Sequence, residues 1–331
     1  PLDWKDSKTY KDRLKEARKK TGINCGIMVV ATKINNINIT ACASDFAFIG
    51  GSVGAAEGEA ILYGIQHAIE NNQPFINFCS GGGMRMFNGS NPELLGVTVS
   101  NNTSTLNGGG IAYEGLPAST IEQRLHRVTV SGNRSSEGVG GGIYLYSSIA
   151  TVTRSFIQDN AASLKGGGLS IEWASELTLE NSFVSGNALT NGVQGSNVYI
   201  GKSDQLIGSN EKLIAMNSNL IDTVALSDEN LFSMYTNGLV KPLLINSITI
   251  GRLDAAIPTS NFDLNYSYCN DCSNLLTFAA NTGNITGSAG FVDFDKGKFD
   301  LADNSLLLSA ATESFTTVAA ETYRAPEVDI R

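Results

Sequence analysis

Residues 140–169, GGGIYLYSSIATVTRSFIQDNAASLKGGGL, begin with a glycine triplet followed by an apolar residue, and they end with the same pattern. This mark occurs four times, at intervals of 27, 32 and 26 residues, as Gly81-Gly82-Gly83-Met84, Gly108-Gly109-Gly110-Ile111, Gly140-Gly141-Gly142-Ile143 and Gly166-Gly167-Gly168-Leu169. A second mark keeps step with it, an apolar residue three positions before an asparagine, at Val99/Asn102, Val130/Asn133, Ile157/Asn160 and Val184/Asn187. One insertion at 114–123 explains the longer interval of both marks, so the chain contains an internal repeat.

A repeat with a period in the twenties predicts a β-solenoid. Short runs such as Val97-Thr98-Val99 and Leu177-Thr178-Leu179 alternate apolar and polar residues, as a strand with one buried face does. In a solenoid each repeat forms one coil, whose strands pair in parallel with the neighbouring coils. We therefore expect the four asparagines to stack with their amides hydrogen-bonded along the axis. The glycine triplets are expected at bends that need positive φ or leave no room for a Cβ atom.

The first 80 residues follow a different pattern, which is typical of an α/β segment. Glycine is scarce before Gly50, and apolar residues lie at helical spacing in 14–17 and 61–69. We predict a basic helix over 6–20, strands near 25–32 and 37–43, a helix near 54–71 and a strand over 74–79. The glycines at 50, 51 and 54 would let backbone N–H groups approach a ligand, or would form only a tight turn.

Composition argues against several classes of partner. The 331 residues carry a net charge of −9, whereas nucleic acids and anionic membranes attract proteins with an excess of Lys and Arg. No apolar run approaches the roughly 18 residues that a membrane helix needs. The five cysteines form no regular framework and favour reduced thiols over a disulfide scaffold. Cys269-x-x-Cys272 has no histidine near it in sequence to complete a zinc site, so no metal site is predicted.

The repeats resemble those of right-handed parallel β-helix proteins, a class that includes bacterial surface and autotransported proteins with Gly-Gly-x-Ile and apolar-x-x-Asn repeats. The resemblance is to an architecture, and its motifs are structural. We expect a β-helix domain over 81–331, with regular repeats over 81–191 and irregular coils over 192–331. Both ends of the chain are expected to be incomplete.

Residues 1–86 resemble a second family, the β subunit of bacterial acetyl-CoA carboxylase carboxyltransferase. The resemblance lies in 4–14 (WKDSKTYKDRL), 45–54 (DFAFIGGSVG) and 80–86 (SGGGMRM), together with Lys20-Thr21-Gly22. It implies a crotonase-like fold and a reaction that moves a carboxyl group from carboxybiotin to acetyl-CoA for fatty-acid synthesis. The expected fold class is thus mainly β, a right-handed parallel β-helix preceded by a small, incomplete α/β crotonase-like segment over 1–80.

The carboxyltransferase resemblance also assigns candidate site residues. Gly82 and Gly83 match the two glycines whose backbone N–H groups form an oxyanion hole in that family, and Gly50, Gly51 and Ser52 match contacts to the acyl-CoA. The family uses carboxybiotin on a carrier protein and a zinc ribbon, and the ribbon has no counterpart here, so we expect this chain to bind no cofactor. Its partners by resemblance are the carboxyltransferase α subunit, the biotin carrier protein and acetyl-CoA.

Two functional hypotheses follow. The stretch 81–86 fits both the carboxyltransferase pattern and the repeat pattern. A recombination or an assembly error at shared glycine codons would produce such an overlap. We expect a composite chain of this kind to be inactive as a carboxyltransferase and to be cytoplasmic. The alternative is a surface or secreted β-helix protein that acts as an adhesin or carbohydrate-binding module. Catalysis by the repeats is not expected, because the scattered acids Asp159, Glu172, Glu176 and Glu180 are assigned to solvated outward positions, as are Arg134 and Arg154. His126 has no nearby catalytic arrangement.

Overall fold

In a computed structural model the chain forms two compact units, residues 1–82 and 83–331. The structure describes residues 8–49, 54–78, 83–87, 93–116, 121–201, 210–222, 231–255, 262–270, 283–285, 291–293, 298–301, 314–316 and 322–324.

The N-terminal unit combines a three-stranded sheet with two helices. Its elements are α1 (Tyr10–Thr21), β1 (Ile27–Ile34), β2 (Ile37–Ser44), α2 (Ala55–Glu70) and β3 (Phe75–Phe78). β1 pairs antiparallel with β2, and β2 pairs parallel with β3. α2 packs closely on one face of this sheet, because a Cβ on Gly64 would lie 2.8 Å from the Cys42 sulfur and 3.0 Å from the Phe75 ring. The predicted elements of this segment are confirmed, with ends that differ by a few residues.

Local sequence explains where the helices begin and end. Thr9 caps α1 by accepting a hydrogen bond from the Asp12 N–H at 3.2 Å, and Gly22 ends it with φ +74°. At the start of α2 the buried Glu57 carboxylate accepts from the Gly54 N–H at 3.1 Å and from the Gly26 N–H at 3.0 Å. This carboxylate therefore satisfies free donors at the helix N-terminus and ties α2 to the start of the sheet.

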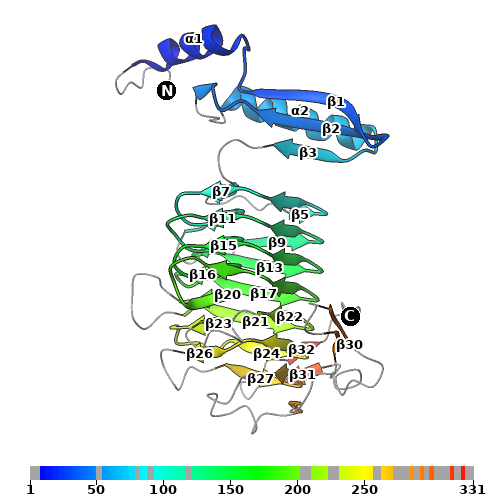
Figure 1. Ribbon diagram of the computed structural model, residues 1–331, viewed down its shortest axis with the longest axis vertical. Helices are drawn as coiled ribbons and strands as arrows, with labels where there is room; N and C mark the ends of the chain where they lie inside the picture. The colour runs from blue at the N-terminus through cyan, green and yellow to red at the C-terminus, as the bar shows by residue number, and fades with distance from the viewer. Residues whose placement is uncertain are drawn as a thin grey trace. The chain divides into compact units, whose positions relative to one another are not determined.

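The C-terminal unit is a solenoid whose coils stack with their strands in parallel (Figure 1). A regular coil contributes one strand to each of four sheets, named S1 to S4 in chain order. S1 consists of β4 (Met84–Phe87), β8 (Ile111–Glu114), β12 (Ile143–Tyr146), β16 (Leu169–Glu172), β20 (Gln194–Ile200), β23 (Phe232–Thr236) and β26 (Leu253–Ala255). S2 consists of β5 (Glu93–Leu95), β9 (Glu122–His126), β13 (Ile149–Thr153), β17 (Glu176–Glu180), β21 (Lys212–Met216), β24 (Leu243–Ile245) and β27 (Asp263–Asn265).

S3 and S4 complete the coil. S3 consists of β6 (Thr98–Ser100), β10 (Thr129–Ser131), β14 (Phe156–Gln158), β18 (Phe183–Ser185), β22 (Asn219–Ile221), β25 (Ile248–Ile250) and β28 (Tyr268–Cys269). S4 consists of β7 (Thr103–Ser104), β11 (Arg134–Ser135), β15 (Ala161–Ala162) and β19 (Ala188–Leu189). Two antiparallel pairs follow, β29 (Phe291–Asp293) with β30 (Lys298–Leu301) and β31 (Ser314–Thr316) with β32 (Thr322–Arg324). The predicted parallel solenoid is confirmed.

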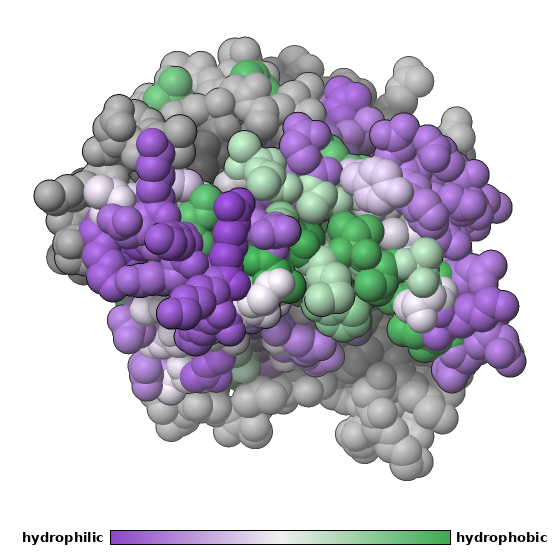
Figure 2. Space-filling model, turned by 90° about the horizontal axis from the view of Figure 1, so that it is seen from above, coloured by the Kyte–Doolittle hydropathy of each residue, from purple (hydrophilic) through white to green (hydrophobic). Residues whose placement is uncertain are grey.

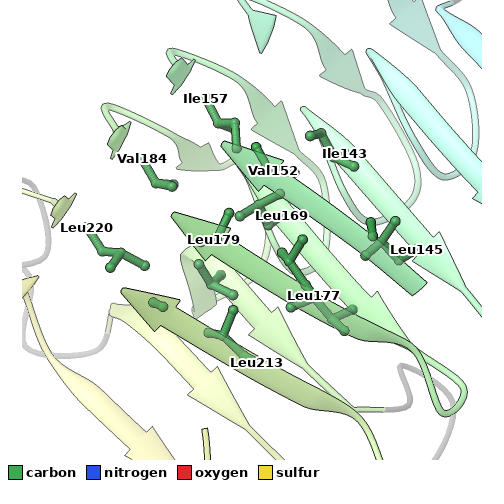
Figure 3. Packing of buried hydrophobic residues seen from close by; sticks show 14 of the residues in the cluster. Ile143, Leu145, Val152, Ile157, Leu169, Leu177, Leu179, Val184, Leu213 and Leu220 are labelled. Atoms are coloured by element: carbon green, nitrogen blue, oxygen red, sulfur yellow. The ribbon is translucent and has the colours of Figure 1, made fainter. Parts of the chain in front are cut away.

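The core of the solenoid is a set of apolar columns, because equivalent residues of successive coils are in register. Leu125, Val152 and Leu179 are paired neighbours on S2 and are at most 1% exposed. Figure 3 shows such side chains from S1, S2 and S3 pointing into the same interior. Burying a side chain of this kind contributes roughly 1.5–3 kcal/mol, so each added coil extends a continuous hydrophobic core.

The predicted asparagine stack is present. The Asn102 amide donates to the Asn133 Oδ1 at 2.9 Å, Asn133 donates to Asn160 at 2.9 Å, and Asn160 donates to Asn187 at 3.0 Å. Asn187 continues the ladder to the Asn197 Oδ1 at 2.9 Å, although Asn197 lies outside the sequence repeat. The asparagines from 133 onward are at most 2% exposed, so these hydrogen bonds satisfy polar groups that water does not reach.

A second ladder, formed by serine, was not expected from the sequence. Its members stand at the turn between S2 and S3, and each hydroxyl accepts from the backbone N–H of the preceding coil at 3.0–3.3 Å. They are Ser155, Ser182, Ser218, Ser247 and Ser267. The ladder ends where the Asn284 Oδ1 accepts from the Ser267 N–H at 3.0 Å.

The glycine triplets mark close contacts between coils, as predicted. The first glycine has positive φ, +65° at Gly140 and +60° at Gly166. At the second position a Cβ on Gly141 would lie 2.2 Å from the Ala161 carbonyl oxygen and 2.4 Å from that of Gly167. No side chain fits there without separating the coils.

Candidate functional site

Most of the site residues assigned by the carboxyltransferase resemblance lie outside the described residues. These are Gly50, Gly51, Ser52 and Gly82. Nearby, the Gly54 N–H at the start of α2 is described, and it donates to the Glu57 carboxylate. Burial opposes ionisation of Glu57, but hydrogen bonds from backbone N–H groups outweigh it and lower its pKa. The Gly54 N–H is thus already paired with an internal carboxylate.

Gly83 is the one assigned residue that the structure describes, and it belongs to the first coil. A Cβ on Gly83 would lie 1.8 Å from the Gly110 carbonyl oxygen. The next residue, Met84, donates its backbone N–H to that same oxygen at 2.7 Å. The backbone at Gly83 is therefore packed against the following coil in the way that Gly110 packs against Gly142.

The outer face of S1 carries buried polar side chains. Glu172 and Tyr199 are 0% exposed and Tyr144 is 4% exposed, and the Ser170 hydroxyl donates to the Glu172 carboxylate at 2.9 Å. Burial, with a smaller effect of the Glu172 charge, raises the pKa of both tyrosines. The expectation that Glu172 is solvated is wrong. Its side chain points to the outer face of the sheet, as alternation along the strand predicts, but this face is itself buried at Glu172.

The turn after β16 has an unusual backbone conformation. Trp173 and Ala174 both have positive φ, +57° and +59°. The Ala174 N–H in this turn donates to the buried Glu211 carboxylate at 3.0 Å. Glu211 is 0% exposed, and its second oxygen has no hydrogen-bond partner among the described residues. A carboxylate of the next coil therefore stabilises this turn.

The outer face of S2 is polar and partly exposed in its second to fourth coils. The Thr151 hydroxyl hydrogen-bonds the Glu122 carboxylate, and this bond, together with Arg124 at 3.1 Å, outweighs burial and lowers the pKa of Glu122. Glu180, two coils further on, has its pKa raised by burial and by the charge of Glu122. His126 is held by a 2.6 Å hydrogen bond between its Nδ1 and the Thr153 hydroxyl.

S2 and S3 meet at a corner that sequence reasoning missed. It presents Arg127 and Arg154 in equivalent turns, and Phe156 and Phe183 on the adjoining strands of S3. The repeat contains a sequence signal for this corner, because Arg127 and Arg154 lie six positions before the ladder residues Asn133 and Asn160.

Comparison with known proteins agrees with the coil geometry. A protein-family model described as "Right handed beta helix region" matches residues 22–220, more than half of the chain. The chain belongs to this right-handed β-helix family. The match begins within the N-terminal unit and ends in β22. Membership shows the architecture, and it assigns no ligand or reaction.

Curated relatives of this β-helix chain are similar to it over a shorter segment. The acetyl-coenzyme A carboxylase carboxyl transferase subunit beta of Pelagibacter ubique (strain HTCC1062) is 74% identical over 86 residues, which are 26% of this chain and 28% of that protein. The subunits of the same name from Rhodopseudomonas palustris (strain BisB5) and Beijerinckia indica subsp. indica are each 44% identical over 89 residues, 28% and 31% of those proteins. The resemblance of residues 1–86 to this subunit is confirmed, and the chain spans less than a third of the relatives' length.

Three further observations concern the described part of the β-helix chain. It contains no helix long and apolar enough to cross a membrane. It also contains no group of three or more His, Cys, Asp or Glu side chains placed to hold a metal ion. Cys269, however, is disulfide-bonded, so the expectation of reduced thiols is wrong at this position. Spacing alone could not reveal this bond because the cysteines follow no regular pattern.

Proposed function

We propose that the chain is a composite whose carboxyltransferase-derived N-terminal part does not catalyse carboxyl transfer. The packing of Gly83 carries this proposal. An oxyanion hole needs backbone N–H groups that face an open site, whereas Gly110 fills the space beside Gly83. Loss of one such donor typically costs about 10²–10³ in rate. We also propose that the first unit has a crotonase-like fold and that the chain binds no cofactor.

The surface of the N-terminal unit supports its origin as part of a larger domain. Leu62, Ile65 and Ile69 lie three and four residues apart on α2 and are 59%, 36% and 74% exposed, although the opposite side of this helix already packs on the sheet. A helix that is apolar on both sides is usually buried on both sides. Figure 2 shows apolar residues gathered in a patch with polar residues on either side of it. The curated relatives are more than three times as long as the matched segment, and we propose that their additional residues cover this surface.

Carboxyl transfer is tested by mixing the purified full chain with acetyl-CoA, a carboxybiotin donor and a carboxyltransferase α subunit. We expect no malonyl-CoA above the enzyme-free background, while a full-length β subunit in the same mixture provides the positive control. Turnover that disappears in a Gly83→Pro variant would overturn the proposal. A single long read of source DNA across codons 75–95 distinguishes the two origins of a composite chain, because a recombined gene yields one continuous product and an assembly error yields none.

A second candidate function, a surface or secreted module that binds carbohydrate, is favoured by two observations. The disulfide at Cys269 suits an oxidising compartment better than the cytoplasm, where the carboxyltransferase reaction would take place. The corner between S2 and S3 presents partly exposed aromatic and charged side chains over a dry core. Capture of the full chain by immobilised glycans tests this candidate, and failure to bind a broad glycan set would contradict it.

A further inference from the structure

The turn between S2 and S3 has the same conformation in each coil that the structure describes at this corner. One residue per coil has φ between +47° and +68°, and in the first four coils its N–H donates to the last carbonyl of the next S2 strand at 2.9–3.1 Å. The residues at this position are Gly96, Arg127, Arg154, Asn181, Asn217, Asn246, Tyr266 and Gly283. Most coils thus place glycine or asparagine there, the two residues that tolerate left-handed backbone best.

Two consecutive coils depart from this preference by placing arginine in the turn. A residue with a long side chain has a higher steric energy in the left-handed conformation than glycine or asparagine. Residues held in this unfavourable conformation cluster at functional sites. Arg127 is exposed and Arg154 is partly exposed. Within the described parts of the chain neither guanidinium group makes an ion pair or a hydrogen bond. Among the described residues, neither arginine therefore has a partner that explains its presence.

Aromatic residues adjoin the two arginines. Phe156 follows Arg154 by two residues and is 40% exposed, and its ring centroid lies 6.3 Å from that of Phe183 in the next coil. On the other side of the turn, the hydrogen bond between His126 and Thr153 ties the ends of the two S2 strands together. We name Arg127, Arg154, Phe156 and Phe183 the arginine corner.

We propose that the arginine corner binds an acidic polysaccharide, an inference that rests on the carbohydrate-binding function proposed above and names its ligand class and site. The two guanidinium groups, carried by coils about 4.8 Å apart, are arranged to bind carboxylate or sulfate groups along one extended chain. The phenyl rings offer an apolar surface on which the faces of sugar rings pack.

Other anionic ligands fit the corner less well. A peptide strand has no sheet edge to pair with here, because β10 and β14 are hydrogen-bonded on both sides. A duplex nucleic acid carries one negative charge for about every 1.7 Å of its axis and is bound by many Lys and Arg residues, whereas this corner offers two arginines. An uncharged polysaccharide would leave both guanidinium groups unpaired.

The test measures retardation of the full chain in native gels that contain polygalacturonate, dextran sulfate or neutral dextran. The first two distinguish carboxylate from sulfate groups, and the third measures binding without charge. The informative variant is Arg127→Asn with Arg154→Asn, because asparagine occupies the same turn at Asn181 and the fold should keep or raise its melting temperature. Arg134→Asn, an exposed arginine on β11, is the control for loss of one positive charge outside the corner.

We expect the double variant to lose affinity for at least one acidic polymer by roughly tenfold or more per arginine, since hydrogen bonds between charged groups are worth that much. Arg134→Asn should change affinity less than twofold. Equal losses in both variants, or binding to neutral dextran alone, would overturn the inference and leave the carbohydrate-binding function standing. Failure to bind all three polymers as well as the broad glycan set would overturn both.

Discussion

Replacing Asn160 with alanine should open the solenoid at its centre. Asn160 is 0% exposed and makes four hydrogen bonds through its side chain. It donates to the Val130 carbonyl oxygen at 2.9 Å and to Asn187 at 3.0 Å, and it accepts from the N–H and the amide of Asn133 at 3.0 and 2.9 Å. At about 1 kcal/mol for each bond, the loss is about 4 kcal/mol.

Asn102 is the matched control because it stands at the partly exposed end of the same ladder. Its side chain donates to the Ser100 carbonyl oxygen at 3.1 Å and to Asn133 at 2.9 Å, and water can replace these bonds after substitution by alanine. We expect Asn102→Ala to cost about 1 kcal/mol. The two variants should therefore differ by about 3 kcal/mol, more than a hundredfold in the equilibrium for local opening.

Hydrogen exchange followed by mass spectrometry measures that opening coil by coil, which suits a repeat protein whose unfolding is not all-or-none. The Asn133 backbone amide loses its acceptor in Asn160→Ala and should exchange at least about a hundred times faster than in the wild type. If the two variants destabilise the solenoid equally, or if the Asn133 amide keeps its protection in Asn160→Ala, the buried ladder is not a principal source of stability.

Three further substitutions test other contacts, each by thermal or denaturant unfolding. Gly141→Ala should destabilise the solenoid by about 3 kcal/mol because the new methyl group would meet the Ala161 carbonyl oxygen, and an unchanged midpoint would contradict this packing. Gly58→Ala should instead stabilise α2 by up to about 1 kcal/mol, since a Cβ there meets nothing within 4 Å. Glu57 has a lowered pKa, so its carboxylate stabilises the fold above the unfolded-state value of about 4.3, and this stabilisation is lost as the pH falls through the folded-state pKa. Glu57→Gln should accordingly lower the midpoint at pH 7 and approach the wild type in acid, whereas a deficit independent of pH would argue against the charge.

The sequence predicts those parts of the solenoid whose spacing is constant. The asparagine ladder and the glycine bends recur at nearly equal intervals, so their stacking could be predicted before any coordinates. The burial of Glu172 could not, because strand alternation shows only that its side chain points away from the axis and says nothing of what covers that face. The arginine corner escaped notice for a related reason, since arginine is not a residue that signals a left-handed turn.

The serine ladder also shows how the protein tolerates insertions. Successive members lie 27 residues apart between Ser155 and Ser182 but 36 apart between Ser182 and Ser218, and only 17 separate Ser267 from Asn284. Each coil is therefore aligned with its neighbour by a side chain at the corner, whatever length of chain has passed in between. Loops can grow or shrink during evolution without shifting the register of the strands, and a lineage could change the outer surface of this protein while its interior stays the same.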